Sequence, residues 1–342
     1  MPIKNNWKSK KIFITGGNGF LGKAIIKMLL QQTDLGEIIS VGRSPQPELK
    51  KFGITTVVAD ICDKKKIIEF SKGSDIIFHT AAKASIWGKY NDFYNTNVIG
   101  TENIIEACKV NNIPIAVYTS SPSVISSKNN IINGDETISY PKKYYSHYAK
   151  TKAIAESIII NAADKILKSV SLRPHLIWGP GDPHILPRII EKASKNKLIR
   201  IGDKKNIVDL TYISNAAYAH IKAAESLMDS YKISGKTYFI SDDAPIILWE
   251  WIDNFLEQLG IPKVKKSLSI NNAKRLGGIF ENIYTLLQKK NEPPITRFAA
   301  MQLGLSHFFD ISAAKKDFSY HPIISNDDAM KTTIAYFAQN QQ

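Results

Sequence analysis

Two tyrosines in the chain have a lysine four residues later, Tyr148 with Lys152 and Tyr218 with Lys222. Residues four apart lie on one face of a helix, so either ammonium could stand beside its phenol and favour the phenolate. A phenol placed in this way could exchange a proton with a substrate. The spacing alone does not separate the two pairs.

Tyr148 is distinguished by its position in the chain. Its predicted helix follows the strand predicted for residues 114–119, whose end carries Ser121 and Ser123. Parallel sheets place ligands at the carboxyl ends of their strands. We therefore predict that Ser121 acts with Tyr148 and Lys152, and that Ser123 is its alternative if the strand end is misplaced. The other tyrosine is interpreted as an ordinary helix residue.

A glycine-rich turn links the first predicted strand to an apolar helix. Gly16, Gly19 and Gly22 form a GxxGxxG pattern, with Phe20 and Leu21 between the last two. Glycine lets the backbone turn sharply and approach a pyrophosphate, and the N–H groups of the helix N-terminus favour the anion. At the start of an alternating β/α pattern, this turn predicts dinucleotide binding rather than a merely tight turn.

The end of the second predicted strand indicates which dinucleotide is bound. A carboxylate there would bind the adenosine ribose and repel a 2′-phosphate, but the chain has Arg43 and no acid. A guanidinium can pair with a phosphate through two hydrogen bonds. We therefore expect NADP(H) to be preferred, with NAD(H) as the alternative if Arg43 is only a solvated loop residue.

These side chains must be positioned by a Rossmann-type α/β fold, a doubly wound parallel sheet with a smaller C-terminal substrate lobe. Short β-branched runs alternate with helical patterns through the first half of the chain. The predicted strands are residues 11–15, 37–41, 55–59, 75–79, 114–119 and 169–173. The predicted helices start near residues 19, 64, 95 and 146. The cofactor domain then comprises residues 1–177 and 204–242, and the substrate lobe comprises residues 178–203 and 243–342.

The composition is that of an ordinary globular chain. Its 342 residues are 44% hydrophobic and 22% charged, which excludes disordered and disulfide-scaffold proteins. The net charge of +14 favours anionic ligands, acidic partners or a membrane surface. Neither Cys62 and Cys108 nor the seven histidines have metal-ligand spacing, so we expect no metal. Without a leader or a long apolar segment, a cytoplasmic protein with no nucleic-acid partner is expected.

Several motifs together resemble the extended short-chain dehydrogenase/reductase superfamily. They are the glycine turn, Asp60-Ile61, His79-Thr80-Ala81-Ala82, Asn97 to Thr101, the Ser121 region and Tyr148xxxLys152. Residues 172–183 resemble the 3β-hydroxysteroid dehydrogenase-like branch of that superfamily. Residues 81–88, 118–124, 178–188, 296–298 and 317–320 are similar to bacterial 2-alkyl-3-oxoalkanoate reductases of olefin biosynthesis.

The resemblance implies roles for individual residues. Tyr148 would give its proton to a carbonyl oxygen, Ser121 would hydrogen-bond the same oxygen, and Lys152 would lower the pKa of the phenol and hold the nicotinamide ribose. Asn97 would lie below this site. Further cofactor contacts are implied for Asp60, Ile61, Ala81, Ala82, Lys83, Thr119 and Pro174. A homodimer through helices near residues 95–111 and 145–161 is also implied.

Two segments are candidates for substrate binding. Aromatic residues such as Trp87 lie among lysines in residues 83–94, which predicts an apolar pocket beside an anion-binding group, or alternatively a packed lobe interface. His184 and Arg188 are one helical turn apart and could meet a substrate carboxylate. Arg188 has the better geometry for a carboxylate, with a surface salt bridge as the alternative.

Residues 262–290 contain seven basic side chains and one acidic one, Glu281, a balance of +6. Within residues 272–290, apolar residues recur at helical spacing, namely Leu276, Ile279, Phe280, Ile283, Leu286 and Leu287. Such a helix could lie on a membrane surface, cover a lipid-like substrate or dock a partner enzyme. We favour the simpler interpretation that its apolar stripe packs inside the second lobe.

The sequence therefore predicts an NADPH-dependent oxidoreductase (EC 1.1.1) that reduces a 3-oxo carboxylic acid with alkyl chains to the 3-hydroxy acid. A 3β-hydroxysteroid or sterol-4-carboxylate 3-dehydrogenase is the first alternative. A nucleotide-sugar epimerase or reductase is the second, although Leu176 stands where such enzymes usually carry an asparagine. A cofactor-sensing protein without turnover is disfavoured by the intact set of Ser121, Tyr148 and Lys152.

Overall fold

A seven-stranded parallel sheet forms the centre of the computed structural model, which describes residues 7–32 and 34–339. Its strand order is β12-β7-β5-β4-β1-β2-β3, and every neighbouring pair is parallel. The strands are β1 Ile12–Thr15, β2 Ile38–Gly42, β3 Thr55–Val58, β4 Ile76–His79, β5 Ile115–Thr119, β7 Lys168–Pro174 and β12 Lys236–Ile240. The predicted Rossmann-type fold is confirmed, and the strand ends differ from the predicted ones by at most one residue.

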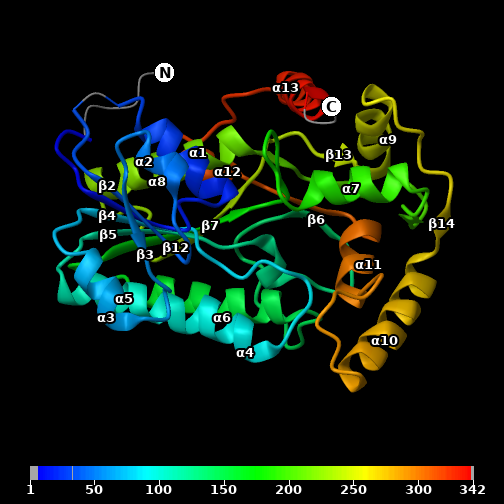
Figure 1. Ribbon diagram of the computed structural model, residues 1–342, viewed down its shortest axis with the longest axis horizontal. Helices are drawn as coiled ribbons and strands as arrows, with labels where there is room; N and C mark the ends of the chain where they lie inside the picture. The colour runs from blue at the N-terminus through cyan, green and yellow to red at the C-terminus, as the bar shows by residue number, and fades with distance from the viewer. Residues whose placement is uncertain (1–6, 33, 340–342) are drawn as a thin grey trace.

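Helices cover both faces of this sheet, as Figure 1 shows. One face carries α1 (Phe20–Leu29), α2 (Pro47–Lys50), α8 (Ile213–Asp229) and α12 (Ser312–Phe318). The other carries α3 (Lys64–Phe70), α4 (Tyr90–Tyr94), α5 (Gly100–Val110) and α6 (His147–Asn161). Ile12 and Ile14 pack in one apolar cluster and Phe13 in the other, because successive strand residues point to opposite faces. Both faces are apolar, as parallel strands require.

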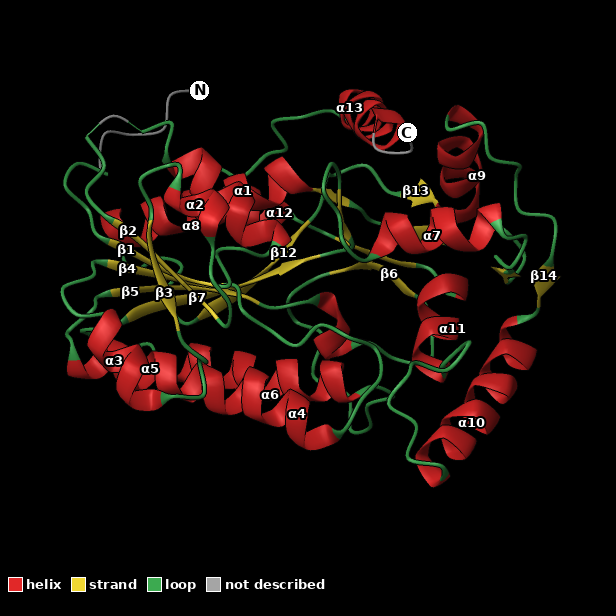
Figure 2. Cartoon of the chain, viewed as in Figure 1, coloured by secondary structure: helices red, strands yellow, loops and turns green. Residues whose placement is uncertain are grey.

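The second lobe is built from short strands and helices at one end of the sheet (Figure 2). A four-stranded sheet joins β13 Ile246–Ile247, β10 Ile207–Val208, β15 His307–Phe309 and β6 Ile131–Gly134. Two small sheets pair β11 Thr211–Tyr212 with β8 Ile177–Trp178, and β14 Ser267–Leu268 with β9 Arg200–Ile201. The helices are α7 Ile185–Ser194, α9 Leu248–Gln258, α10 Ile270–Leu286, α11 Arg297–Gly304 and α13 Asn326–Gln339.

Several segments cross the predicted domain boundaries. β12 lies in the main sheet, whereas β6, β10 and β11, all within ranges assigned to the cofactor domain, pair within the sheets of the second lobe. Conversely, α12 packs on the main sheet, where the Tyr238 hydroxyl donates to Asp317 at 2.7 Å. Strands of two to four residues carry too little pattern to reveal their pairing partners, so only the tertiary structure assigns them.

The favoured interpretation of the basic helix is wrong. In α10 the residues buried against the protein are Ala273, Gly277 and Glu281, while the apolar stripe faces outward. Leu286 is 82% exposed and Ile279 is 54% exposed. Helical spacing showed that these residues share one face but not which way that face points. No helix in the described part of the chain is long and apolar enough to cross a membrane.

Candidate active site

The glycine turn between β1 and α1 lies against the loop that follows β4. Gly16 has a φ of +71°, and a Cβ there would lie 2.9 Å from the backbone N of Ala81. A Cβ at Gly22 would collide with the carbonyl oxygen of Gly16. Gly19 is the N-cap of α1 and offers no side chain to its N–H groups. The turn is therefore shaped for a group that needs bare backbone, and a dinucleotide pyrophosphate fits it.

The other residues predicted for the cofactor lie near the carboxyl ends of neighbouring strands. Thr119 ends β5, Pro174 ends β7, and Ala81, Ala82 and Lys83 follow β4. The backbone N–H of Ala81 donates to Thr15 Oγ1 at 3.2 Å, which fixes this loop beside the glycine turn.

The predicted adenosine end of this site lies beyond β2 and β3. Arg43 is exposed after β2 and close enough to Cys62 to affect the pKa of its thiol. Asp60 is also exposed and accepts from the backbone N–H of Cys62 at 2.9 Å. Ile61 is buried and packs against Gly100, the first residue of α5.

Ser121 and Tyr148 are brought together at the end of β5. Ser121 is the N-cap of the 3₁₀ turn η2 (Pro122–Ile125), and Tyr148 is the second residue of α6. Ser146, the N-cap of α6, accepts from the backbone N–H of Tyr148 at 3.1 Å. The Ser121 hydroxyl lies close enough to the phenol of Tyr148 to lower its pKa. Two caps therefore place these hydroxyls side by side, although their roles in a reaction stay predictions.

The acidity of Tyr148 departs from the expectation drawn from the resemblance. Burial raises the pKa of the phenol above its ordinary value, and the nearby Ser121 hydroxyl lowers it by less. The Lys152 ammonium was expected to make the phenol more acidic, but desolvation outweighs any such effect in this structure. The phenol is therefore protonated at neutral pH and able to donate.

Lys152 is only 2% exposed. Its Nζ donates to the carbonyl oxygen of Thr119 at 2.5 Å and lies 4.0 Å from the centre of the Tyr118 ring. Burial lowers the pKa of Lys152 to about 7, and the charge of Glu156 partly opposes this effect. The lysine therefore titrates close to neutral pH, where it can hold or release a proton.

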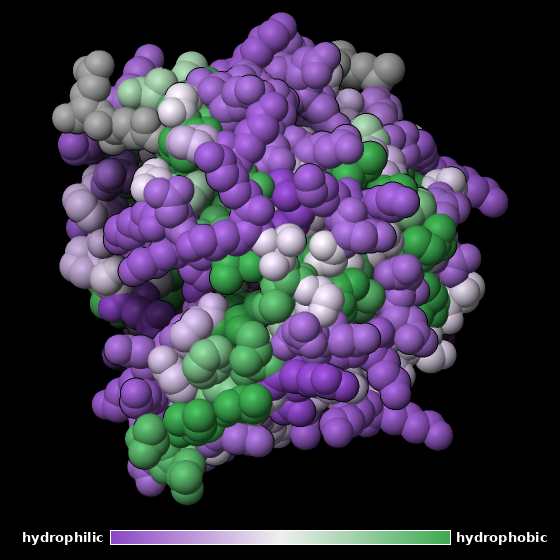
Figure 3. All heavy atoms as spheres, turned by 90° about the vertical axis from the view of Figure 1, so that its right-hand side faces the viewer, coloured by the Kyte–Doolittle hydropathy of each residue, from purple (hydrophilic) through white to green (hydrophobic). Residues whose placement is uncertain are grey.

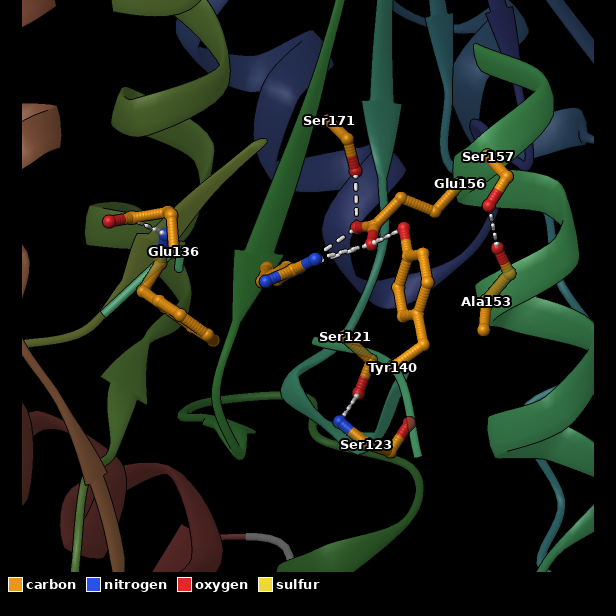
Figure 4. A network of polar contacts seen from close by, with 10 residues as sticks. Ser121, Ser123, Glu136, Tyr140, Ala153, Glu156, Ser157 and Ser171 are labelled. Atoms are coloured by element: carbon orange, nitrogen blue, oxygen red, sulfur yellow. Dashed lines mark hydrogen bonds and ion pairs between the residues drawn. The ribbon is translucent and has the colours of Figure 1, made fainter. Parts of the chain in front are cut away.

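A buried ionic network lies one helical turn beyond Lys152. Glu156 is paired with Arg173 at 2.6 Å and accepts from the hydroxyls of Tyr140 at 2.7 Å and Ser171 at 2.8 Å (Figure 4). Burial would raise the pKa of Glu156, but Arg173 holds it below its usual value. The network fastens α6 to β7. No sequence motif predicted this network, although the spacing of four residues places Glu156 on the same helix face as Lys152.

His79 is a second buried group that sequence analysis did not interpret. Its ring nitrogens are hydrogen-bonded to Thr15 Oγ1 at 2.7 Å and to Thr101 Oγ1 at 3.0 Å. Burial and the Lys152 ammonium lower its pKa to about 3, so the ring is neutral. His79 therefore connects β1 and β4 to α5 beneath the glycine turn.

Asn97 lies in a π-helical turn, η1 (Asn95–Ile99), between α4 and α5. Its Oδ1 accepts from the backbone N–H of Lys83 at 2.8 Å, and its Nδ2 donates to Thr151 Oγ1 at 3.0 Å. π-Helical turns are frequent at functional sites. Asn97 thus joins the loop after β4 to α6 through the residue next to Lys152, which makes it a positioning residue.

A cavity of about 1340 Å³ opens beside the start of α6. It lies between the loop after β4, the residues that precede Tyr148, and one side of α10. Lysines and aromatic rings line much of it, including Lys83, Trp87, Tyr90 and Tyr284. Trp87 donates through Nε1 to the carbonyl oxygen of Lys289 at 3.2 Å. This contact joins the loop after β4 to the residues that follow α10.

Of the residues predicted for substrate binding, Trp87 lines the large cavity and the others do not. Trp87 lines the large cavity, as do Ser146 and His147 just before Tyr148. Ser123 is buried and lines a different cavity, of about 20 Å³. His184 is exposed at the start of α7, and Arg188 forms an ion pair with Glu292, which is the salt bridge that the sequence left open. Contact of these last three with a substrate stays a prediction.

Comparison with known proteins places the chain among dehydrogenases and reductases. The 3-beta hydroxysteroid dehydrogenase/isomerase family matches residues 13–270. A 2-alkyl-3-oxoalkanoate reductase of Stenotrophomonas maltophilia is 40% identical, over 94% of this chain and 97% of its own length. The sterol-4-alpha-carboxylate 3-dehydrogenase, decarboxylating, of Mus musculus is 30% identical, over 96% and 91%.

Solved structures share the fold. The crystal structure of gox2253 superposes with a TM-score of 0.78 at 23% identity, covering 97% of this chain and 99% of the other. The UDP-glucuronic acid 4-epimerase of Bacillus cereus in complex with NAD has a TM-score of 0.74 at 22% identity, covering 97% and 100%. At these identities the likeness extends to the fold alone.

Proposed function

Because the chain belongs to the 3-beta hydroxysteroid dehydrogenase/isomerase family, we propose that it reduces a 2-alkyl-3-oxoalkanoate to the 3-hydroxy acid with NADPH. Like its relatives, it is an oxidoreductase that uses a nicotinamide cofactor. The observation that carries the proposal is the proximity of Ser121 and Tyr148 at the end of β5, with Lys152 on the same helix as Tyr148.

The side chains of this site suit proton donation to a carbonyl group. Tyr148 is protonated at neutral pH, so it can give its proton to the oxygen while Ser121 hydrogen-bonds the same atom. Lys152, fixed by the Thr119 carbonyl and with a pKa of about 7, can return a proton toward the phenol after turnover. The dinucleotide, when bound, supplies the hydride.

The preference for NADPH rests on the end of β2. Arg43 is exposed there and free to turn toward a 2′-phosphate, and no acid stands in the position that favours NAD. NAD(H) is the alternative, since the solved epimerase named above binds NAD.

The class of substrate is inferred from the large cavity and the named relatives. A 2-alkyl-3-oxo acid has alkyl chains and a carboxylate, and the cavity offers rings together with Lys83, Lys150 and Arg297. Aromatic side chains supply apolar contact area, and the cations supply the charge that a carboxylate needs.

A panel of substrates tests the proposal. NADPH oxidation should be fast with long-chain 2-alkyl-3-oxo acids and slow with 3-oxosteroids, and UDP-sugars should not react. The same panel is run with Tyr148→Phe as a control for background oxidation. Turnover of a UDP-sugar with no reaction of any keto acid would overturn the assignment.

A sterol-4-carboxylate 3-dehydrogenase is the second candidate. The observation in its favour is the 30% identity to the Mus musculus enzyme over nearly the whole chain. Alcohol oxidation is the same proton transfer in reverse, with the phenolate of Tyr148 as the acceptor. The higher identity to the 2-alkyl-3-oxoalkanoate reductase, 40%, ranks the reductase first. A sterol carboxylate oxidised with NAD⁺ more efficiently than any keto acid is reduced would reverse this order.

A further inference from the structure

Helix α10 presents an apolar face that the rest of the protein does not cover. The exposed fractions are 40% for Leu276, 54% for Ile279, 43% for Ile283, 82% for Leu286 and 58% for Leu287. These residues lie three or four apart and so form one stripe along the helix. α10 lies at the lower right edge of the molecule in Figure 1, and Figure 3, which faces that side, shows hydrophobic side chains gathered at the lower edge.

The remaining sides of α10 already have partners. Gly277 lies so close to α11 that a Cβ there would stand 2.6 Å from the backbone N of Arg297. Glu281 accepts from the backbone N–H and the side chain of Arg297, each at 2.6 Å. Tyr284 and Thr285 line the large cavity. Small and polar residues therefore hold the helix in place, and the large apolar residues are left for another contact.

Basic residues flank this stripe along the chain. Lys265 and Lys266 precede α10, Arg275 lies within it, and Lys289 and Lys290, which also line the large cavity, follow it; all five are exposed. Glu281, the one carboxylate in residues 262–290, is 8% exposed and paired with Arg297. The outward surface of this segment therefore carries cations and apolar side chains but none of its own carboxylates.

We propose that this face of α10 docks onto the surface of an anionic lipid bilayer. Apolar side chains on one side of a helix, with basic residues at its margins, match the acyl boundary and the charged headgroups of such a surface. A second copy of the chain fits less well, because a two-fold contact would place the same cations opposite one another. A partner protein would need both acidic residues and an apolar groove.

Docking in this way places the large cavity at the lipid surface. α10 carries the apolar stripe on one side and lines the cavity with Asn282, Tyr284 and Thr285 on another. An amphiphilic substrate could then pass from the bilayer into the cavity without crossing bulk water. The docking itself is independent of the reaction proposed above.

Flotation with lipid vesicles tests the proposal with the full chain. Vesicles of phosphatidylcholine alone are compared with vesicles that also contain phosphatidylglycerol, at low and at high salt. The wild-type protein should float with the anionic vesicles at low salt and less well in the other conditions. The double variant Leu286→Glu with Leu287→Glu should lose at least tenfold in bound fraction.

Matched variants keep the outcome clear. Ile166→Glu alters a side chain that is 67% exposed on a loop outside α10 and should float like the wild type. Tyr148→Phe should also float, so a failure of the proposed reaction would not affect this result. All variants except Tyr148→Phe should reduce a short, soluble keto acid at the wild-type rate.

Three results would overturn the proposal. The first is wild-type protein that stays unbound in every vesicle preparation. The second is a double variant that floats as well as the wild type. The third is a dimer in sedimentation that the double variant alone dissociates, since the stripe would then belong to a contact between copies.

Discussion

This protein has a reaction side, around Lys152, Glu156 and Arg173, and a cavity side, which lines the large cavity. The charged side chains of the two sides are held in different ways. Lys152, Glu156 and Arg173 are at most 3% exposed, and each finds its polar partner within the protein. Around the cavity, by contrast, the side chain of Lys83 is 34% exposed and that of Arg297 is 42% exposed. Buried charges must be paired and so have one geometry, whereas half-exposed ones can rearrange in water.

This difference is consistent with the separate tasks that we propose for the two regions. A proton donor needs a fixed position, because its hydrogen bond to the reacting oxygen is short and directional. A pocket for alkyl chains of varied length gains from side chains that adjust. We therefore expect changes on the reaction side to alter rate or stability strongly, and changes on the cavity side to alter substrate affinity.

The largest effect is expected for Tyr148→Phe. Loss of the phenol hydroxyl removes the proton donor and should lower kcat by roughly 10² to 10⁴-fold. Binding of NADPH, measured by fluorescence titration, should be unchanged because the glycine turn is intact. Full activity of the variant would contradict the role of Tyr148 as proton donor, since the buried site would then not be the reactive one.

A buried and an exposed arginine should differ in their effect on stability. Arg173→Met leaves Glu156 buried without its cation and should lower the free energy of unfolding by roughly 3–5 kcal/mol. Arg188→Met removes an exposed ion pair with Glu292 and should cost roughly 0–1 kcal/mol. Urea unfolding measures both. Equal losses would show that burial does not set the energetic cost of breaking these ion pairs.

The low pKa of Lys152 predicts a pH dependence of stability. The group has a pKa of about 7 in the folded protein and an ordinary value of 10.5 when unfolded, so between these values the unfolded chain binds the extra proton. Stability from this group therefore rises with pH, by at most about 1.4 kcal/mol per pH unit. Wild-type stability should increase relative to Lys152→Met from pH 7 to 9. Parallel pH curves would contradict the prediction.

The smallest effect is expected at the exposed edge of the cofactor site. Arg43→Asp should lower the ratio of kcat/KM for NADPH to that for NADH by roughly 10 to 100-fold, because a charge-assisted phosphate contact becomes a repulsion. Lys72→Asp makes the same charge change in the loop before β4 and should leave the ratio unaltered. An unchanged ratio in Arg43→Asp would show that this arginine makes no contact with the 2′-phosphate.

The parallel sheet, the glycine turn and the Tyr148 motif could all be predicted from the sequence. Each depends on a short run of residues. Successive side chains of a strand point to opposite faces, and a helix brings every third or fourth side chain to the same face, so the spacing fixes the local geometry. Ser121 could be added because it lies two positions after Thr119, where the predicted strand ends. The proximity of Ser121 to Tyr148 was predicted in this way from elements only 27 positions apart.

The tertiary structure alone decided which groups lie buried together and which remain in water. Glu156 meets Arg173 because α6 packs on β7, and Arg188 meets Glu292 because α7 lies near the segment before α11. The apolar stripe of α10 has the period of a core helix but faces outward, because small residues take the inner side. Periodicity depends on neighbours along the chain, whereas burial and charge pairing depend on neighbours in space.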